Sequence, residues 1–456
     1  MYQIKYKSEE EMKDSGIEWL GKIPNDWKVE SLKRTLKDIS GNGFPIEMQG
    51  KRRGEIPFLK VSDINSNEIN VRNAINYVSY RDCKLNNWSI INKNSILMAK
   101  IGEALRKNHR KINKVDCLID NNMLALSNKK GKYKYYYYLL SSVDMDWFIN
   151  PGAVPSINMN KLRNFKIPWC NEYKQQKIAN FLDTKTTQFD SIILKKEKLI
   201  QKLEEAKKSL ISEVVTGKVK IVDGELVQRK PSEMKDSGIE WLGVVPKEWK
   251  ITKLKYFCDT IKGYGFNSSL FCDHGHPVIR ASEIKNNTIV ENKVFINKEK
   301  IEKYKQVRLK KNDIVMSTVG STPDVVNSAV GQIAKVPIYF DGALLNQNTV
   351  IFRVINDSID NGYLFRIACS NKFRKYLDLH AHGTANQASL TLKEVLEFPI
   401  AVSIISEQIK INQYLEGKVY DISKTITKIK LQIKKLKQAK QSLISEAVTG
   451  KIDFRD

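Results

Sequence analysis

The chain has 456 residues, 41% hydrophobic and 28% charged, which is typical of a folded globular protein and excludes a disordered chain. Lysine and arginine total 76 against 51 acidic residues, and the resulting net charge of +25 favours a polyanionic partner such as nucleic acid. No run approaches the ~18 apolar residues that cross a bilayer, and the N-terminus lacks a signal-peptide core, so we expect a cytoplasmic protein without membrane contact.

The six cysteines are scattered and form no C-x-x-C pair, a pattern typical of thiols in a reducing compartment. The cluster of cysteine and histidine at residues 272–276 lacks the ligand spacing of a zinc site. We therefore predict no metal site.

The first element along the chain is a phrase that occurs twice. Residues 12–21 (Met-Lys-Asp-Ser-Gly-Ile-Glu-Trp-Leu-Gly) return letter for letter as residues 234–243, which indicates a tandem duplication. The spacing of Ser15 and Glu18 is that of a capping box and predicts a short helical turn. Trp27 and its copy are predicted to be packing anchors, with base stacking as the weaker alternative.

A mixed insert follows each copy of the phrase, over about residues 28–169 and 250–402. Both inserts contain short β-rich runs broken by Asn, Gly and Asp turns, and the echo of Gly-x-Gly-aromatic at 41–44 and 263–266 indicates one shared frame. The tyrosine-rich residues 133–140 are predicted to form a helix packed on the insert core rather than a platform for stacked bases.

A long arm with a 3.5-residue apolar repeat closes each copy, and this repeat predicts a coiled coil. At about 1.5 Å per residue, about 40 residues make a helix of roughly 60 Å. We expect the two arms to pair antiparallel about a pseudo-two-fold axis, with the inserts at opposite ends; the alternative is two separate helices, each on its own insert. The residues predicted for helix pairing or subunit docking are Phe189, Ile192, Leu199, Leu203, Leu210, Ile422, Ile429, Leu436 and Leu443.

No catalytic constellation stands out in either copy. The chain has no P-loop, its Gly-x-Gly pairs are too short for a dinucleotide fingerprint, and it has no Asn-Pro-Pro-aromatic motif for amino methylation. We therefore predict that the chain carries no catalytic residues of its own.

Basic and polar loops occur at matched places in the two inserts. Arg and Lys suit phosphates and guanine edges, while Asn and Gln suit adenine edges. For any single residue a solvated surface position is the stronger interpretation, but as a set these loops favour DNA contact. The candidates in the first insert are Lys51, Arg52, Arg53, Lys60, Lys100, Arg106, Lys107, Asn108, His109 and Arg110. Those in the second insert are Arg280, Ser321, Thr322, His382, Thr384, Asn386 and Gln387.

The repeated phrase, the Ile-Pro-x-x-Trp or Val-Pro-x-x-Trp after it, and the Ser-Leu-Ile-Ser-Glu-x-Val-Thr-Gly-Lys that closes both arms together resemble the DNA specificity subunit of a type I restriction–modification system. The resemblance covers nearly the whole chain. It implies two target recognition domains, each reading one half of an asymmetric bipartite sequence in double-stranded DNA, with the helical arms as spacer.

The resemblance also implies partners that carry the chemistry. Two methylation subunits would dock on this scaffold and use S-adenosylmethionine, and restriction (translocase) subunits would use ATP and Mg²⁺, while this chain binds no cofactor. The alternatives are a stand-alone DNA nuclease or methyltransferase, or a coiled-coil nucleic-acid-binding scaffold outside restriction–modification.

The expected fold class is α+β, with two mixed α/β target recognition domains joined by two long antiparallel coiled-coil helices in a pseudo-two-fold tandem repeat. The expected segments are a first recognition domain at 1–169, its arm at 170–217, a linker at 218–233, a second recognition domain at 234–402, its arm at 403–450, and a tail at 451–456.

Overall fold

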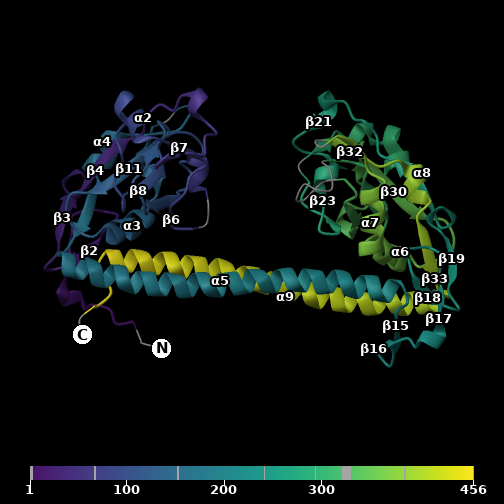
Figure 1. Ribbon diagram of the computed structural model, residues 1–456. Helices are drawn as coiled ribbons and strands as arrows, with labels where there is room; N and C mark the ends of the chain where they lie inside the picture. The colour runs from purple at the N-terminus through teal and green to yellow at the C-terminus, as the bar shows by residue number, and fades with distance from the viewer. Residues whose placement is uncertain are drawn as a thin grey trace. The chain divides into compact units, whose positions relative to one another are not determined.

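The computed structural model describes residues 4–65, 68–150, 152, 154–240, 242–292, 294–320, 330–384 and 387–454. The chain divides into two compact units, the first made of Met1–Lys196 with Leu431–Asp456 and the second of Glu197–Lys430. Each unit contains one insert and a segment of both long helices (Figure 1). The partition therefore cuts both arms, which the sequence predicts as segments of their own.

The first unit is built on a five-stranded sheet with the order β4-β11-β8-β9-β6, beside a three-stranded sheet β10-β5-β7. These strands are β4 Leu36–Ser40, β5 Ile56–Leu59, β6 Asn70–Val71, β7 Asn76–Val78, β8 Ile96–Ala99, β9 Arg110–Asn113, β10 Leu118–Ile119 and β11 Met123–Asn128. The unit also contains β1 Met12–Asp14, β2 Lys22–Pro24, β3 Lys28–Ser31, α1 Leu32–Thr35, α2 Tyr80–Leu85, α3 Tyr133–Ser141, β12 Ile149–Asn150, β13 Ser156–Ile157, α4 Met159–Asn164 and β14 Lys166–Trp169.

The second unit repeats this frame with a four-stranded sheet, β20-β30-β26-β28, and a parallel pair of β22 and β29. These strands are β20 Cys258–Lys262, β22 His276–Ile279, β26 Ile314–Ser317, β28 Ile333–Lys335, β29 Leu344–Leu345 and β30 Thr349–Val354. Its other elements are β15 Val219–Val222, β16 Glu225–Gln228, β17 Met234–Asp236, β18 Val244–Pro246, β19 Lys250–Lys253, β21 Phe271–Cys272, β23 Ile284–Lys285, β24 Thr288–Ile289, β25 Phe295–Ile296, β27 Val319–Gly320, α6 Asn361–Ala368, α7 Asn371–Leu379, β31 His382–Thr384, β32 Gln387–Ser389, α8 Leu392–Leu396 and β33 Pro399–Val402.

The central strands are continuous apolar runs because both faces of each sheet are covered. In β8, Ile96 belongs to the hydrophobic cluster that includes the helix α3, while Leu97 belongs to a separate cluster on the other face. In β26, Ile314 and Val315 divide between two clusters in the same way. The β-rich runs predicted at these strands are confirmed.

The tyrosine-rich segment forms the helix α3, and its rings lie in the core as predicted. Tyr135 is fully buried and its hydroxyl donates to the backbone oxygen of Val448, at 3.0 Å. In the second unit Tyr363 of α6 makes the equivalent bond to the oxygen of Val215, at 3.4 Å. Each recognition domain is thus tied to the last turn of the long helix of the other copy.

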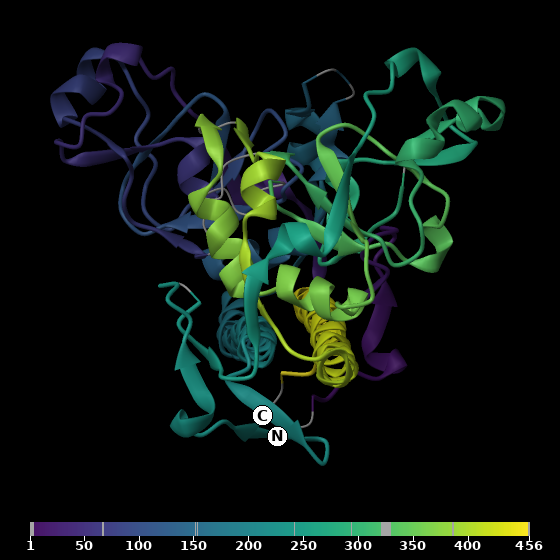
Figure 2. The same ribbon diagram turned by 90° about the vertical axis from the view of Figure 1, so that its right-hand side faces the viewer.

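The two arms are the helices α5 (Glu172–Val215) and α9 (Ile405–Val448). In the first unit the Lys440 ammonium lies 2.7 Å from the Asp190 carboxylate, and Lys196 donates to Gln432 at 2.7 Å. In the second unit residues 211, 214 and 215 share a hydrophobic cluster with residues 411 and 415. The predicted antiparallel pairing is confirmed, and Figure 2 shows the two helices side by side.

The predicted seam of the coiled coil is correct at seven of its nine residues and wrong at Ile192 and Leu199. Ile192 and Leu199 are 44% and 45% exposed, whereas Ile193 is 8% exposed. Residues 192–193 and 199–200 are all Ile or Leu, so an alternation of four and three steps fits either register, and only the partner helix selects one. The remaining predicted seam residues are buried or half-buried: Phe189, Leu203, Leu210, Ile422, Ile429, Leu436 and Leu443.

The repeated phrase forms a β-hairpin, β1–β2 and β17–β18, and the predicted helical turn lies between its strands, where the amide of Gly21 donates to the oxygen of Ile17 at 3.0 Å. The predicted capping box is wrong. Gly16 has a φ of +68°, a left-handed conformation that prevents a helix from starting at Ser15. The Ser15 hydroxyl instead accepts a bond from the amide of Ile17, at 3.1 Å. Trp27 is buried, as expected of a packing anchor.

Each arm ends against the Pro-x-x-Trp segment that follows the repeated phrase of the other copy. A Cβ added to Gly450 would lie 2.6 Å from Pro24 Cγ, and one added to Gly217 would lie 2.4 Å from Pro246 Cγ. The region predicted as a linker forms the hairpin β15–β16 beside this second contact. Among the described residues, no helix is both long and apolar enough to cross a membrane.

We predict that Gly450→Ala destabilises the first unit more than Gly16→Ala does. Both glycines have positive φ values, +78° and +68°, so both substitutions strain the backbone, at a cost of about 1–2 kcal/mol. Only at Gly450 would the new methyl group also overlap Pro24 and Trp27, which adds a further loss of about 1–3 kcal/mol. Thermal unfolding of the two variants checks this; equal losses would contradict the tight packing at the arm tip.

Candidate nucleic-acid interface

In the first unit, polar residues gather where several strands end. Ser40 ends β4, Lys60 follows β5 and Lys100 follows β8. The Lys100 amide donates to the oxygen of Asn122 at 2.7 Å, and the Lys100 ammonium lies 3.4 Å from the Ser40 hydroxyl. The amide of Asp120 donates to the oxygen at the end of β5, at 3.0 Å. We call these five residues the first polar edge.

The second unit builds the same edge from different side chains. Lys262 ends β20, Arg280 follows β22 and Thr318 follows β26. The Thr318 amide donates to the oxygen of Asn348, and the Asn346 amide donates to the oxygen at the end of β22, both at 2.8 Å. These five residues are the second polar edge. The backbone bonds are the same in both units, whereas the side chains differ at four of the five positions, and Asn122 and Asn348 are the shared asparagine.

Each polar edge requires a glycine where two backbone segments approach closely. A Cβ on Gly41 would lie 1.7 Å from the backbone oxygen of Asp120, and one on Gly263 would lie 1.8 Å from that of Asn346. No side chain fits at either place. The Gly-x-Gly echo in the sequence therefore marks a close approach of two backbones.

The loops that the sequence predicts to contact DNA lie beside these edges. In the first unit the Gly102 amide donates to the oxygen of Pro155 at 2.8 Å, and the Ile157 amide donates to the oxygen of Lys100 at 3.0 Å. In the second unit the Leu390 amide donates to the oxygen of Thr318 at 2.9 Å, and β27 pairs with β32. In each unit a strand-end loop and a late hairpin thus meet at the polar edge.

The predicted basic turn at residues 51–53 lies next to the first polar edge. Lys51, Arg52 and Arg53 are exposed. Lys60 donates to Gln49 Oε1 at 2.8 Å, which places the start of this turn beside the edge. These three side chains can meet phosphates without rearrangement.

The loop at residues 106–109 is only partly available to a ligand. Arg106 and Lys107 are exposed, whereas Asn108 accepts a bond from the amide of Met145 at 3.2 Å. Burial lowers the pKa of His109, so that side chain is less able to carry a positive charge.

Arg110 was predicted to contact DNA, and the structure contradicts this. The residue is 5% exposed, and its guanidinium donates to the backbone oxygens of Asn108 at 2.7 Å and Val143 at 2.8 Å. Burial lowers the pKa of Arg110 to about 10. Its role is to hold two loops together from inside the domain.

The structure describes only some of the candidate DNA-binding residues of the second insert. Ser321, Thr322 and Asn386 lie outside the described residues, and Thr384 pairs with Gln387 through the backbone of β31 and β32. His382 is exposed, and its Nε2 lies 2.8 Å from Glu394 Oε1. This pairing leaves part of the imidazole open to a ligand.

Sequence reasoning missed Glu283, which is 4% exposed and holds Arg280. A signal was present, because the acid follows three residues after the base in both copies, as in Lys60 and Asp63. Such spacing indicates a capped turn. It does not indicate that the side chains pair.

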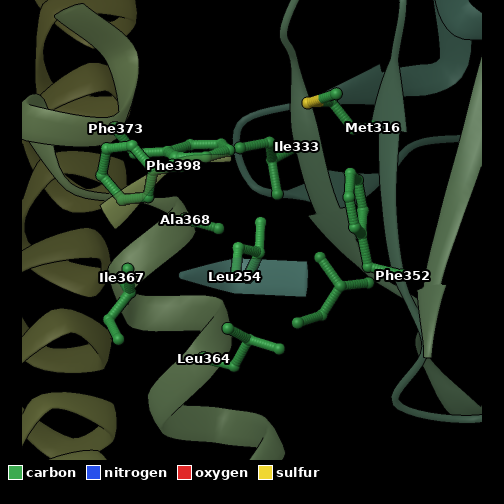
Figure 3. Close-up of a pocket in the computed structure, with 10 residues that line it drawn as sticks. Leu254, Met316, Ile333, Phe352, Leu364, Ile367, Ala368, Phe373 and Phe398 are labelled. Atoms are coloured by element: carbon green, nitrogen blue, oxygen red, sulfur yellow. The ribbon is translucent and has the colours of Figure 1, made fainter. Parts of the chain in front are cut away.

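The small hollow drawn in Figure 3 is a packing defect of the second unit rather than a ligand site. Its volume is about 20 Å³, and its lining is entirely apolar, with Leu254, Phe352 and Leu364 among the residues. A space of this size and polarity stays dry. Within the described ranges, no group of three or more His, Cys, Asp or Glu side chains is placed to hold a metal ion.

Comparison with known proteins identifies relatives along almost the whole chain. The family model described as "Type I restriction modification DNA specificity domain" matches residues 24–205 and 246–435. The type I restriction enzyme MjaVIII specificity subunit of Methanocaldococcus jannaschii is 25% identical over 447 residues, covering 95% of each chain. The putative MjaX specificity subunit of the same organism is 26% identical over 469 residues, covering 98% of each.

A solved chain supports the fold. It comes from a structure described as the basis of complex assembly and conformational transition of the type I restriction–modification system. It matches with a TM-score of 0.65 at 13% identity, over 93% of this chain and 98% of that one. At this identity the match shows a shared fold.

We predict that Arg110→Ala lowers the free energy of unfolding by about 2–4 kcal/mol, because two backbone oxygens lose a charged donor inside the domain. The matched variant Arg106→Ala removes an exposed arginine and should change it by less than about 0.5 kcal/mol. Thermal unfolding separates the two. An Arg110→Ala variant of unchanged stability but weaker DNA binding would restore the original prediction.

Proposed function

The chain belongs to the family of type I restriction–modification DNA specificity proteins, and on that premise we propose that each of its two units reads one half of a bipartite duplex DNA target. One observation carries this proposal. The two polar edges share a backbone frame and differ in their donors and acceptors, with Lys100 and Asp120 where the second unit has Thr318 and Asn346. Unlike side chains on one frame suit unlike half-sites.

The charge of the chain suits the backbone of duplex DNA. The net charge is +25. Four exposed basic residues lie on or beside the polar edges: Lys51, Arg52, Arg53 and Lys262. Such residues contact phosphates and fix the register in which the edges meet the bases. We assign these four residues to phosphate contact.

The repeated frame supports a proposal about partners. Each unit presents the same hairpin and the same arm tip, which suits two copies of one methylation subunit. Those subunits would bind S-adenosylmethionine and methylate adenine N6, and restriction subunits would use ATP and Mg²⁺, all in the cytoplasm. This chain would supply recognition and no chemistry. The family match favours this function over a stand-alone nuclease or methyltransferase and over a scaffold outside restriction–modification.

We predict that exchanging residues 28–169 for the equivalent insert of another family member changes one half of the methylated sequence and leaves the other half and the spacer intact. The reason is that the first polar edge lies wholly within residues 28–169 and the second wholly within residues 250–402. Sequencing of modified adenine in DNA from cells that carry the exchanged chain gives the result. The reciprocal exchange of residues 250–402 is the matched control. A change in both halves from one exchange would refute the modular proposal.

A further inference from the structure

We propose that Arg280 reads a guanine in the half-site of the second unit, and that Glu283 is the positioning residue that aims it. This inference rests on the proposed DNA-reading function. It specifies which DNA base one position of the second polar edge recognises, and which two residues recognise it.

Arg280 is held by a buried carboxylate. Its Nε and Nη2 donate to Glu283 Oε1 at 3.1 and 2.7 Å, and its own backbone amide donates to Glu283 Oε2 at 2.6 Å. Glu283 is 4% exposed and also accepts a bond from the Ser282 hydroxyl at 3.0 Å. A carboxylate with this many donors is fixed in place, so the guanidinium loses little further entropy when it binds.

The other edge of the guanidinium is open. The side chain is 39% exposed, and its hydrogen bonds to described residues come from Nε and Nη2. Nη1 and the second proton of Nη2 form a planar pair of donors. Guanine presents N7 and O6 as a matching pair of acceptors in the major groove, and the Arg–guanine pair is the commonest specific contact there.

The equivalent residue in the first unit shows that this pairing is not needed for the turn. Lys60 has the same backbone conformation as Arg280, with φ −108° and ψ 167°, and its amide donates to Asp63 Oδ2 at 2.7 Å. The Lys60 side chain, however, extends to Gln49 instead of Asp63. The bond from the backbone amide therefore caps the turn without a contact between the side chains. The additional contact between the side chains of Arg280 and Glu283 serves to orient the guanidinium.

The neighbours of Arg280 place it where a base edge would lie. The Asn346 amide donates to the oxygen of Ile279, the residue just before Arg280, at 2.8 Å. Asn346 and Thr318 are uncharged, whereas Lys262 is exposed and suits a phosphate. Arg280 is thus the one candidate arginine of the second insert, set among uncharged donors and acceptors.

The test uses the complex of this chain with its methylation subunits and a library of duplexes randomised at both half-sites. Sequencing of the bound fraction gives the base preference at each position. The variants are Arg280→Lys, Glu283→Gln and, as a matched control, Lys262→Gln. Thermal unfolding of each complex reports on the fold.

We expect Arg280→Lys to reduce the preference for guanine at one position by about tenfold or more, since a lysine cannot form the paired contact. Preferences elsewhere should be unchanged. Glu283→Gln should weaken the same preference for guanine although Arg280 and its charge remain. If Arg280→Lys lowers the stability of the complex, Glu283→Gln still tests the proposal. Lys262→Gln should weaken binding to all sequences alike.

Unchanged base preferences in both Arg280→Lys and Glu283→Gln would overturn the inference, as would an equal loss of affinity for every sequence, which is the result expected of a phosphate contact. If the unmodified complex enriches no bipartite sequence at all, the proposed function fails, and the inference fails with it.

Discussion

Each long helix is followed, two residues after its end, by a glycine beside which there is no room for a side chain, because a proline and a tryptophan of the other repeat fill the space. Gly450 packs against Pro24 and Trp27 in the first unit, and Gly217 packs against Pro246 and Trp249 in the second. The buried hydroxyls of two core tyrosines reinforce both contacts. Each unit is therefore composite: its recognition domain comes from one repeat and the arm tip that closes it from the other.

This exchange accounts for the identity of the repeated phrases. A phrase that meets the arm tip of its own copy could drift together with that tip. Here each copy meets the arm tip of the other copy, so a change in one repeat disturbs a contact with the other repeat. The polar edges carry no such constraint. Their backbone bonds need only a glycine at the close approach, and their side chains are free to differ, as a specificity subunit requires.

Much of the fold follows from local patterns in the sequence. The arms and the helix α3 could be predicted, because their periodicity is long or their aromatic residues are dense. The register of the seam could not, since Ile192 and Ile193 fit the repeat equally well and only the partner helix distinguishes them. The short turn after Ser15 could be predicted, but not its capping, because the left-handed Gly16 brings the amide of Ile17 rather than that of Glu18 to the Ser15 hydroxyl.

The candidate site shows where sequence reasoning ends. Charge and polarity located the loops beside the polar edges, but burial decides which of their residues can bind. Arg110 and Arg106 look alike in the sequence, yet one lies in the core and the other in solvent. Glu283 was passed over because a buried acid paired with an arginine has the same local sequence as an ordinary turn.

The most direct test of the exchanged arm tips is hydrogen exchange on a chain that lacks residues 449–456, with a chain that lacks only residues 455–456 as control. The account predicts that the longer deletion reduces amide protection in the hairpin β1–β2 and in α3, although these lie more than 300 residues earlier in the sequence. Protection in β17–β18 and α6 should be unchanged. A loss of protection in β17–β18 and α6 instead, or no loss in either unit, would contradict it.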